Sequence, residues 1–169
     1  MSKLPFIIPE HEFNFRSSMV LIILMNLSTT KTGKLHLTID RINIYRFLLN
    51  HPKYLRELLQ KEKGKELVLH DNELNNIQDL FPNYSFHTRH KELKSLLIML
   101  SNLKFVSVTI EKDIYFSITT EGTNIIKEVE SEFIKRSSDF CIAMKSIQSL
   151  STNQLYLKVQ SIIKGGMNT

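Results

Sequence analysis

Few residues of this chain could carry catalytic or metal chemistry, and a histidine pair is the first to consider. His87 and His90 stand three residues apart, a spacing that can bring two imidazoles to one metal ion. Such a site needs a third, rigidly held ligand, and no cysteine cluster or matching His–carboxylate pattern accompanies the pair. We expect these histidines to be solvent-exposed where a loop meets a helix, and we expect no bound metal.

Two further features resemble pieces of an active site. Glu92-Leu93-Lys94 matches the acidic-x-lysine end of many nuclease motifs. In those nucleases the tripeptide lies on a strand and an upstream acid helps to bind a metal, whereas here the pattern predicts a helix. Cys141 has apolar neighbours in a predicted helix, so we expect it to behave as a small hydrophobic residue.

Motifs that bind phosphates or present a nucleophile do not occur. The sequence contains no Gly-x-x-x-x-Gly-Lys, Gly-x-Gly-x-x-Gly or Gly-x-Ser-x-Gly pattern. Five glycines in the whole chain leave little material for a phosphate loop. We therefore expect a protein that is not an enzyme and that has no cofactor.

The composition narrows the class of protein. A length of 169 residues fits one domain, and 42% hydrophobic with 23% charged residues is typical of a folded globular chain. One cysteine and no secretory signal favour the reducing cytoplasm. The longest apolar run, residues 19–25, is too short to cross a bilayer, so we expect no membrane partner. A net charge of +5 favours weak contact with nucleic acid.

The first half of the chain is predicted to be mainly helical. Thr38 is a suitable N-cap for a helix that should end at His51, because the residue before Pro52 disfavours helical backbone. Asparagines, Gly64 and Pro82 make residues 62–88 irregular, which we interpret as an insertion with one short helix at about 73–80. The expected elements are a helix at 9–27, a strand at 34–38, a helix at 39–49 and a helix from 53 to about 61.

The second half has clearer periodicity. Leucines at helical spacing predict a helix at 89–103, and alternating apolar residues predict a hairpin of two strands, 106–110 and 114–118. An apolar seam at sevenfold spacing predicts one long helix at about 121–149. Ser151 and Gln154 form a capping-box pattern for a last helix at 152–163, closed by two glycines.

These elements predict a mostly helical α+β fold with a winged-helix core, in which the hairpin is the wing. We expect one domain over residues 1–149, which includes the irregular insertion and the long helix at about 121–149. A short C-terminal helix at 150–164 and a disordered tail at 165–169 should follow it.

The helix after Arg89 is the candidate for DNA contact, because a helix-turn-helix places its second helix in the major groove. Lysines there and in the wing suit phosphates, but Ile98 and Met99 do not suit base edges. We therefore expect contact with the DNA backbone and no readout of sequence. The candidate contacts are Arg89, Lys91, Lys94 and Lys112.

The helix at 39–49 carries apolar residues on two sides. Ile42 and Tyr45 mark one face, whereas Ile44 and Phe47 lie on the other. Two explanations remain open: the insertion at 62–88 covers the second face, or the face is exposed and binds a partner protein. On the second explanation, Ile44, Phe47 and Ile98 are the candidate partner contacts.

Several segments resemble the middle components of ABC-three-component systems. These segments are Phe15-Arg16 with the apolar helix that follows, Leu37-Thr38-Ile39-Asp40-Arg41-Ile42, Phe47-Leu48-Leu49-Asn50-His51-Pro52 and Ile118-Thr119-Thr120-Glu121-Gly122. The resemblance covers most of residues 13–135, and the insertion at 62–88 departs from the leaner members of the family.

The resemblance implies a winged-helix accessory subunit that stands between an SMC-like coiled-coil ATPase and an effector, often a nuclease. Lamassu-type defence of bacteria against phages and plasmids is the best-known setting. It implies no catalytic residues, and non-specific contact with double-stranded DNA is secondary. The alternative is a stand-alone winged-helix transcriptional regulator, which would form a dimer through the predicted helix at 121–149.

Overall fold

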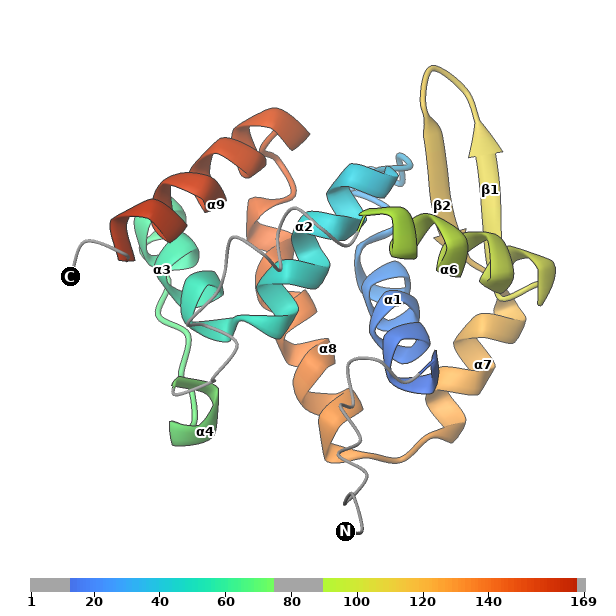
Figure 1. Cartoon of the computed structure of the whole chain (residues 1–169), viewed down its shortest axis with the longest axis horizontal. Helices are drawn as coiled ribbons and strands as arrows, with labels where there is room; N and C mark the ends of the chain where they lie inside the picture. The colour runs from blue at the N-terminus through green and yellow to red at the C-terminus, as the bar shows by residue number, and fades with distance from the viewer. Residues whose placement is uncertain (1–12, 75–89, 167–169) are drawn as a thin grey trace, which may run out of the picture.

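A computed structural model describes residues 13–74 and 90–166 of the chain. Within these residues the fold is mostly helical with one two-stranded antiparallel sheet, which confirms the predicted mostly helical α+β class (Figure 1). The elements in chain order are α1 (Phe13–Leu27), α2 (Ile39–Asn50), α3 (Pro52–Lys63), α4 (Asp71–Leu74), α6 (His90–Asn102), β1 (Val106–Ile110), β2 (Ile114–Ile118), α7 (Thr120–Glu128), α8 (Glu132–Met144), the 3₁₀ turn η3 (Lys145–Ile147) and α9 (Thr152–Gly166).

The centre of the fold is α1, which is buried on nearly all sides. Successive residues from Met19 to Leu24 are buried, so this helix has no polar face along its middle. It packs against α8, α2, α7 and β2, and Figure 1 shows it in the middle of the molecule. The apolar run at 19–25 is therefore part of a core helix. Among the described residues, no helix is both long and apolar enough to span a membrane.

Both apolar faces of α2 are buried, which corrects the proposed exposed face. The predicted Thr38 cap is confirmed, because its side chain accepts a hydrogen bond from the backbone N–H of Arg41 at 3.4 Å. Ile44 and Phe47 are each 3% exposed. The ring of Phe47 lies 4.4 Å from that of His51, at the start of α3, and α9 also packs against α2. These two residues belong to the core because α3 and α9 return to α2, a long-range arrangement that helical periodicity cannot reveal.

The buried guanidinium of Arg41 joins α2 to the turn before α9. Its Nη2 atom donates to the carbonyl oxygens of Gln148, at 3.1 Å, and of Leu150. Its Nη1 atom donates to the Thr152 hydroxyl at 3.2 Å, and its Nε atom donates to the Tyr45 hydroxyl at 3.3 Å. One side chain thus satisfies several polar groups that burial would otherwise leave unpaired.

The hairpin has the predicted strands, and it projects from the helices in Figure 1. Val106 pairs with Ile118 at its base and Ile110 with Ile114 at its tip. The separate strand expected at 34–38 is not formed as a regular strand, although Thr38 itself has extended backbone and α2 begins at Ile39. What remains is an isolated bridge between Thr29 and Leu35, and a hydrogen bond of 2.9 Å from Phe116 N to Leu37 O.

The hairpin leads into α7 through a cap in which Thr119 is the central residue. Its hydroxyl donates to the carbonyl oxygen of Lys104 at 2.6 Å and accepts from the N–H of Gly122 at 3.1 Å. Its own N–H donates to the carbonyl oxygen of Phe105 at 3.1 Å. Thr119 therefore fixes both the closing of the hairpin and the start of the helix.

The single helix predicted at about 121–149 is wrong, because the chain forms α7, α8 and η3 there. Val129 is extended, and the Ser131 side chain caps α8 by accepting from Ile134 N at 3.3 Å. A serine side chain that accepts a hydrogen bond from the following backbone favours a new helix start over continued helix. At Ser131 this cap divides the segment into two helices, although the apolar seam favoured one.

The C-terminal helix has the predicted capping box. Ser151 N donates to the Gln154 side chain at 2.9 Å, and Gln154 N donates to the Ser151 hydroxyl at 3.2 Å. Gly165 and Gly166 continue α9 instead of closing it, so the predicted tail starts too early. The helix predicted at 73–80 appears only as α4, and its later residues lie outside the described part of the chain.

His36 provides a first testable prediction. Burial and the nearby Arg41 charge lower the pKa of His36 from 6.5 to about 4, and its Nε2 atom lies 3.3 Å from the Tyr45 hydroxyl. Between pH 6.5 and pH 4, His36 is protonated in the unfolded chain but not in the folded chain. The free energy of unfolding should therefore fall as the pH drops from 6.5 toward 4. Because the ring is only partly buried, we expect a loss of about 1 kcal/mol.

Urea denaturation at pH 7 and pH 5 measures this effect. The variant His36→Gln should lose less stability on acidification than the parent chain. The variant His70→Gln, at an exposed position, serves as the control and should keep the parental pH dependence. Equal pH dependence in all three proteins would contradict the assignment to His36.

Candidate docking groove

An apolar groove of about 430 Å³ lies between α6 and the hairpin. Six hydrophobic side chains from α2, α6 and both strands line it: Ile39, Leu97, Ile98, Val108, Ile114 and Phe116. Figure 1 shows α6 beside the hairpin at one end of the molecule. The groove is thus built from the elements that the sequence predicted as the DNA-facing helix and its wing.

The hairpin supplies one wall because its apolar face is longer than the core beneath it. Residues of one face pair across the strands, Val108 with Phe116 and Ile110 with Ile114. Along β1 the exposed fraction rises from 3% at Val106 to 42% at Val108 and 77% at Ile110. The apolar face is therefore buried at the base of the hairpin and open to solvent toward its tip.

The helix α6 supplies the other wall because it carries apolar residues on both faces. Leu93, Leu97 and Leu100 are buried toward the core, whereas Ile98 is 54% exposed on the outer side. Exposed apolar side chains on both sides of a groove, here Ile98 on α6 and Val108 and Ile114 on the hairpin, are typical of surfaces that bind another protein. It is a poor surface for base edges, which present polar groups.

The polar residues that line this groove include Lys94 and His90, and no acidic residue among those that the structure describes lines it. The His90 ring is held at one end, with Nε2 3.0 Å from a carboxylate oxygen of Asp40 in the first turn of α2. Lys94 is exposed on α6. The groove therefore combines an apolar floor with positive charge at its rim.

The structure separates the site residues predicted from sequence. Lys94 and Ile98 meet in the groove, whereas Lys91 and Lys112 are exposed and do not line it. The buried Ile44 and Phe47 do not reach this surface. Arg89 and His87 lie outside the described residues.

Sequence reasoning missed the part of the groove that the strands provide. Val108, Ile114 and Phe116 were assigned to a half-buried hairpin, for which alternation is the usual sign. The signal that could have found the groove is that all three residue pairs of one hairpin face are apolar, including the pair at the tip. A two-stranded hairpin that projects from a small core cannot bury such a face along its whole length.

The nuclease-like tripeptide and Cys141 lie in places where they support the fold. Leu93 of Glu92-Leu93-Lys94 is buried on α6, and Glu92 lies 3.8 Å from Arg16. Cys141 is fully buried, and burial raises the pKa of its thiol to about 12, so the thiol stays protonated. Among residues 13–74 and 90–166, no group of three or more His, Cys, Asp or Glu side chains is arranged to hold a metal.

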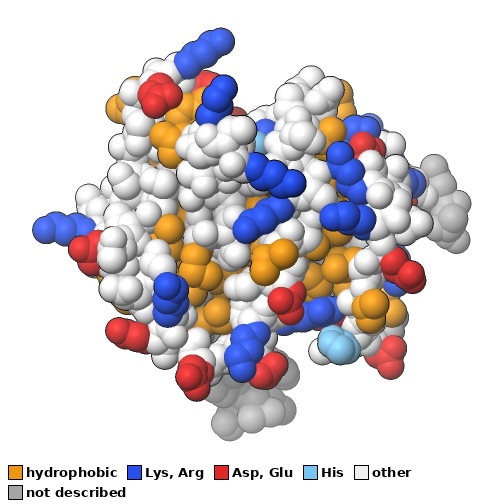
Figure 2. Space-filling view, turned by 180° about the vertical axis from the view of Figure 1, so that it is seen from behind, with side chains coloured by type: hydrophobic (Ala, Val, Ile, Leu, Met, Phe, Trp, Pro, Cys, Tyr) orange, Lys and Arg blue, Asp and Glu red, His pale blue; other side chains and the backbone are white. Residues whose placement is uncertain are grey.

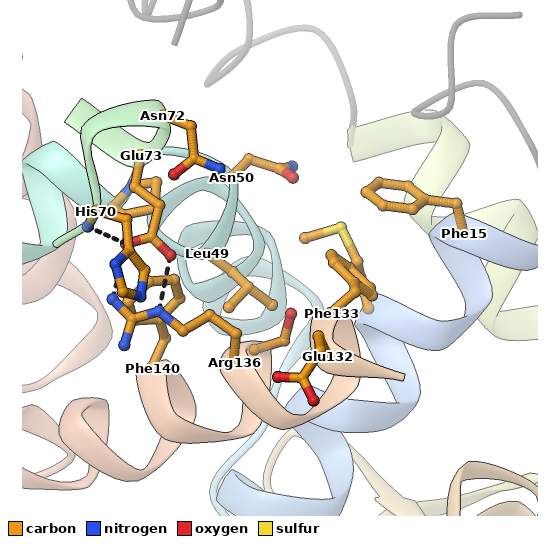
Figure 3. Close-up of a pocket in the computed structure, with 13 residues that line it drawn as sticks. Phe15, Leu49, Asn50, His70, Asn72, Glu73, Glu132, Phe133, Arg136 and Phe140 are labelled. Carbon is orange, nitrogen blue, oxygen red and sulfur yellow. Dashed lines mark hydrogen bonds and ion pairs between the residues drawn. The ribbon is translucent and has the colours of Figure 1, made fainter. Parts of the chain in front are cut away.

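A second cleft, of about 450 Å³, lies where α8 meets the segment around α4. Arg136 donates to both carboxylate oxygens of Glu73 at 2.7 Å and to the carbonyl oxygen of Val68 at 2.7 Å. The guanidinium lies 4.4 Å from the centre of the Phe140 ring, and it lowers the pKa of the Glu73 carboxyl. Figure 3 shows Glu73 and Arg136 pointing toward each other. These groups attach the insertion to α8, so we assign them a structural role.

Basic side chains are not confined to the face that carries α6. Figure 2 shows the opposite side of the molecule, where Lys and Arg side chains gather around the upper middle. Acidic side chains on that side lie mainly in the lower half and at the edges. The charge of +5 is therefore spread over more than the predicted α6 surface.

Comparison with known families matches most of the chain to a family model. The family model described as ABC-three component (ABC-3C) system Middle Component 4 matches residues 27–157. That span extends from the end of α1 into α9 and includes both walls of the groove. No curated protein and no solved structure matches the chain.

Proposed function

Because the chain belongs to the Middle Component 4 family of ABC-three component systems, we propose that it is a non-catalytic adaptor in a bacterial defence complex. In this proposal it holds an effector, such as a nuclease, on an SMC-like coiled-coil ATPase of the Lamassu type. The arrangement of α1, α2 and α6 with the hairpin serves as a winged-helix unit. Contact with the DNA backbone through lysines is secondary.

The groove between α6 and the hairpin is the observation that carries the proposal. A middle component has to bind other components, and this groove offers exposed Ile98, Val108 and Ile114 to a neighbour. Because each of these side chains is already about half buried, covering the rest of one should stabilise a complex by about 1 kcal/mol. A few such anchors are enough for a stable interface.

The chemistry of the groove defines the occupant that we propose. The floor is apolar, Lys94 lies at the rim, and the described residues that line the groove include no acidic side chain. The complementary ligand is an amphipathic segment of another component, with hydrophobic residues along one face and acidic residues beside them.

A double variant tests the adaptor role. Ile98→Asp with Ile114→Asp places two charges in the groove, and we expect about tenfold or greater loss of co-purifying components after co-expression of the whole system. Both side chains are more than half exposed, so the variant itself should fold normally. Recovery is measured by affinity purification and quantitative mass spectrometry.

The control is Ile142→Asp on α8, because Ile142 is also 54% exposed but does not line the groove. This variant should retain its partners. Full retention by the double variant would contradict the use of the groove.

The alternative, a stand-alone regulator, is favoured by one observation, the exposure of Lys91 and Lys94 on α6. It requires sequence-specific binding of the isolated protein to an operator, which phosphate contacts alone do not provide. Specific binding by a chain that purifies without partners would replace the adaptor proposal.

A further inference from the structure

A small basic pocket of about 270 Å³ lies apart from the groove, between two turns that are distant in the sequence. One is the turn at 30–34 after α1, and the other is the segment 145–149, which comprises η3 and the two residues after it. Apart from Gln148, the residues that line it are two lysines and four residues with hydroxyl groups: Thr30, Lys31, Thr32, Lys145, Ser146 and Ser149.

The charge around this pocket is not neutralised by the segments that form it. Residues 17–39 contain no aspartate or glutamate, and neither do residues 140–169. These two acid-free stretches meet at the pocket, and none of the described residues that line it is acidic. Lys31 and Lys145 are exposed, and neither forms an ion pair within the described part of the chain. The pocket therefore has a net positive charge that an anion can neutralise.

Buried polar contacts hold the two walls in place. The side-chain amide of Gln148 donates to the carbonyl oxygens of Leu27 at 3.2 Å and Thr29 at 3.4 Å, which ties one turn to the other. The backbone of Gln148 is in turn bonded to Arg41. A pocket whose walls are fixed before binding loses little entropy when a ligand enters.

The turn at 30–34 presents its hydroxyl groups in a fixed arrangement. Thr30 N donates to Lys34 O at 2.9 Å, and Gly33 adopts the positive φ of 76° that closes the turn. The hydroxyls of Thr30 and Thr32 lie 3.0 Å apart, and Lys34 N donates to the Thr30 oxygen. When Thr30 donates to Thr32, the Thr32 hydroxyl proton remains for an external acceptor.

We propose that this pocket binds a phosphate group, held by the ammonium groups of Lys31 and Lys145 and by the hydroxyl groups of Thr32 and Ser149. The Ser146 hydroxyl donates to the carbonyl oxygen of Ala143 at 2.9 Å and therefore belongs to the wall of the pocket. Ammonium and hydroxyl donors around a positive cavity match the charge and the oxygen acceptors of a phosphate. The phosphate is either part of a nucleic-acid backbone or part of a free nucleotide. This site is independent of the docking groove, and it puts phosphate contact at a place that the α6 lysines do not provide.

Charge reversal at the two lysines tests the proposal. Binding of a labelled DNA duplex is measured by fluorescence anisotropy over a series of salt concentrations. Chemical shifts of the amides at 30–34 and 145–149 are followed by NMR during titration with inorganic phosphate and with ATP. The variant is Lys31→Glu with Lys145→Glu.

Two other double variants lose the same charge elsewhere. Lys53→Glu with Lys65→Glu changes exposed lysines near α3, and Lys91→Glu with Lys94→Glu changes the α6 surface. Any effect of net charge alone is therefore the same in all three proteins.

If the backbone is the source, Lys31→Glu with Lys145→Glu should weaken duplex binding about tenfold and reduce the salt dependence by about one to two phosphate contacts. The α3 control should change binding about threefold or less. If a nucleotide is the source, ATP or phosphate should shift the pocket amides of the parent chain and not those of the variant. The proposal is overturned if the pocket variant and the α3 control behave alike toward duplex, phosphate and ATP.

Discussion

Replacing Arg41 with methionine is expected to destabilise the folded chain by about 3 kcal/mol or more. The substitution keeps most of the side-chain volume but removes the donors to Gln148 O, Leu150 O and the Thr152 hydroxyl. Arg41 is 4% exposed, so water cannot replace these hydrogen bonds without opening the contact between α2 and α9. Urea denaturation gives the change in unfolding free energy, and hydrogen exchange should show faster exchange in α9.

Arg136→Met is the matched control. Arg136 also bonds to a carbonyl and additionally pairs with Glu73, but its side chain is 29% exposed. The Glu73 side chain that this substitution leaves unpaired is 14% exposed but lines a cleft that water can enter, so we expect a smaller loss, of about 1–2 kcal/mol. If Arg41→Met lowers the free energy of unfolding no more than Arg136→Met does, the buried hydrogen bonds of Arg41 stabilise the fold no more than an exposed pair.

Replacing Gly122 with alanine should cost about 2–4 kcal/mol, although alanine normally stabilises a helix relative to glycine. A β-carbon at this position would collide with the carbonyl oxygen of Phe105 and would lie 2.9 Å from Cγ1 of Ile118. Phe105 O also accepts the hydrogen bond from Thr119 N, so it cannot move without disturbing the cap. The midpoint and slope of urea denaturation measure the effect.

Gly165→Ala gives the opposite expectation. Gly165 lies in α9, and apart from its chain neighbours and the backbone of its own helix no described atom lies within 4 Å of the position of an added β-carbon. Alanine there should stabilise the chain by up to about 1 kcal/mol, because it reduces the freedom of the unfolded backbone. A Gly122→Ala variant as stable as the parent would mean that the hairpin and α7 can separate at little cost.

Local patterns in the sequence predicted the local features of the fold. The hairpin strands were predicted to the residue because apolar and polar positions alternate on both sides of Lys112-Asp113. The caps at Thr38 and Ser151 were predicted because a side chain needs only a neighbouring backbone group to bond to. These features depend on residues within a few positions of each other.

The features that sequence patterns missed depend on residues far apart in the chain, or on competition between a helix cap and a continuous helix. The break between α7 and α8 results from capping by Ser131, which the apolar seam on either side obscured. Burial of Ile44 could not be predicted, because α9 has to return to α2 to cover it. The groove likewise requires α6 and the hairpin to be adjacent, so single exposed positions such as Ile98 were identified without their neighbours.

The contact between Arg41 and the turn at 148–152 also bears on how the chain is synthesised. While the polypeptide is still emerging from the ribosome, α2 is available long before its partner segment, which lies more than one hundred residues downstream. Until translation has passed α9, one hydrophobic side of α2 and the buried guanidinium lack their native cover. A nascent chain of this kind is a natural client for ribosome-associated chaperones, and a prematurely terminated product would be prone to aggregation and proteolysis.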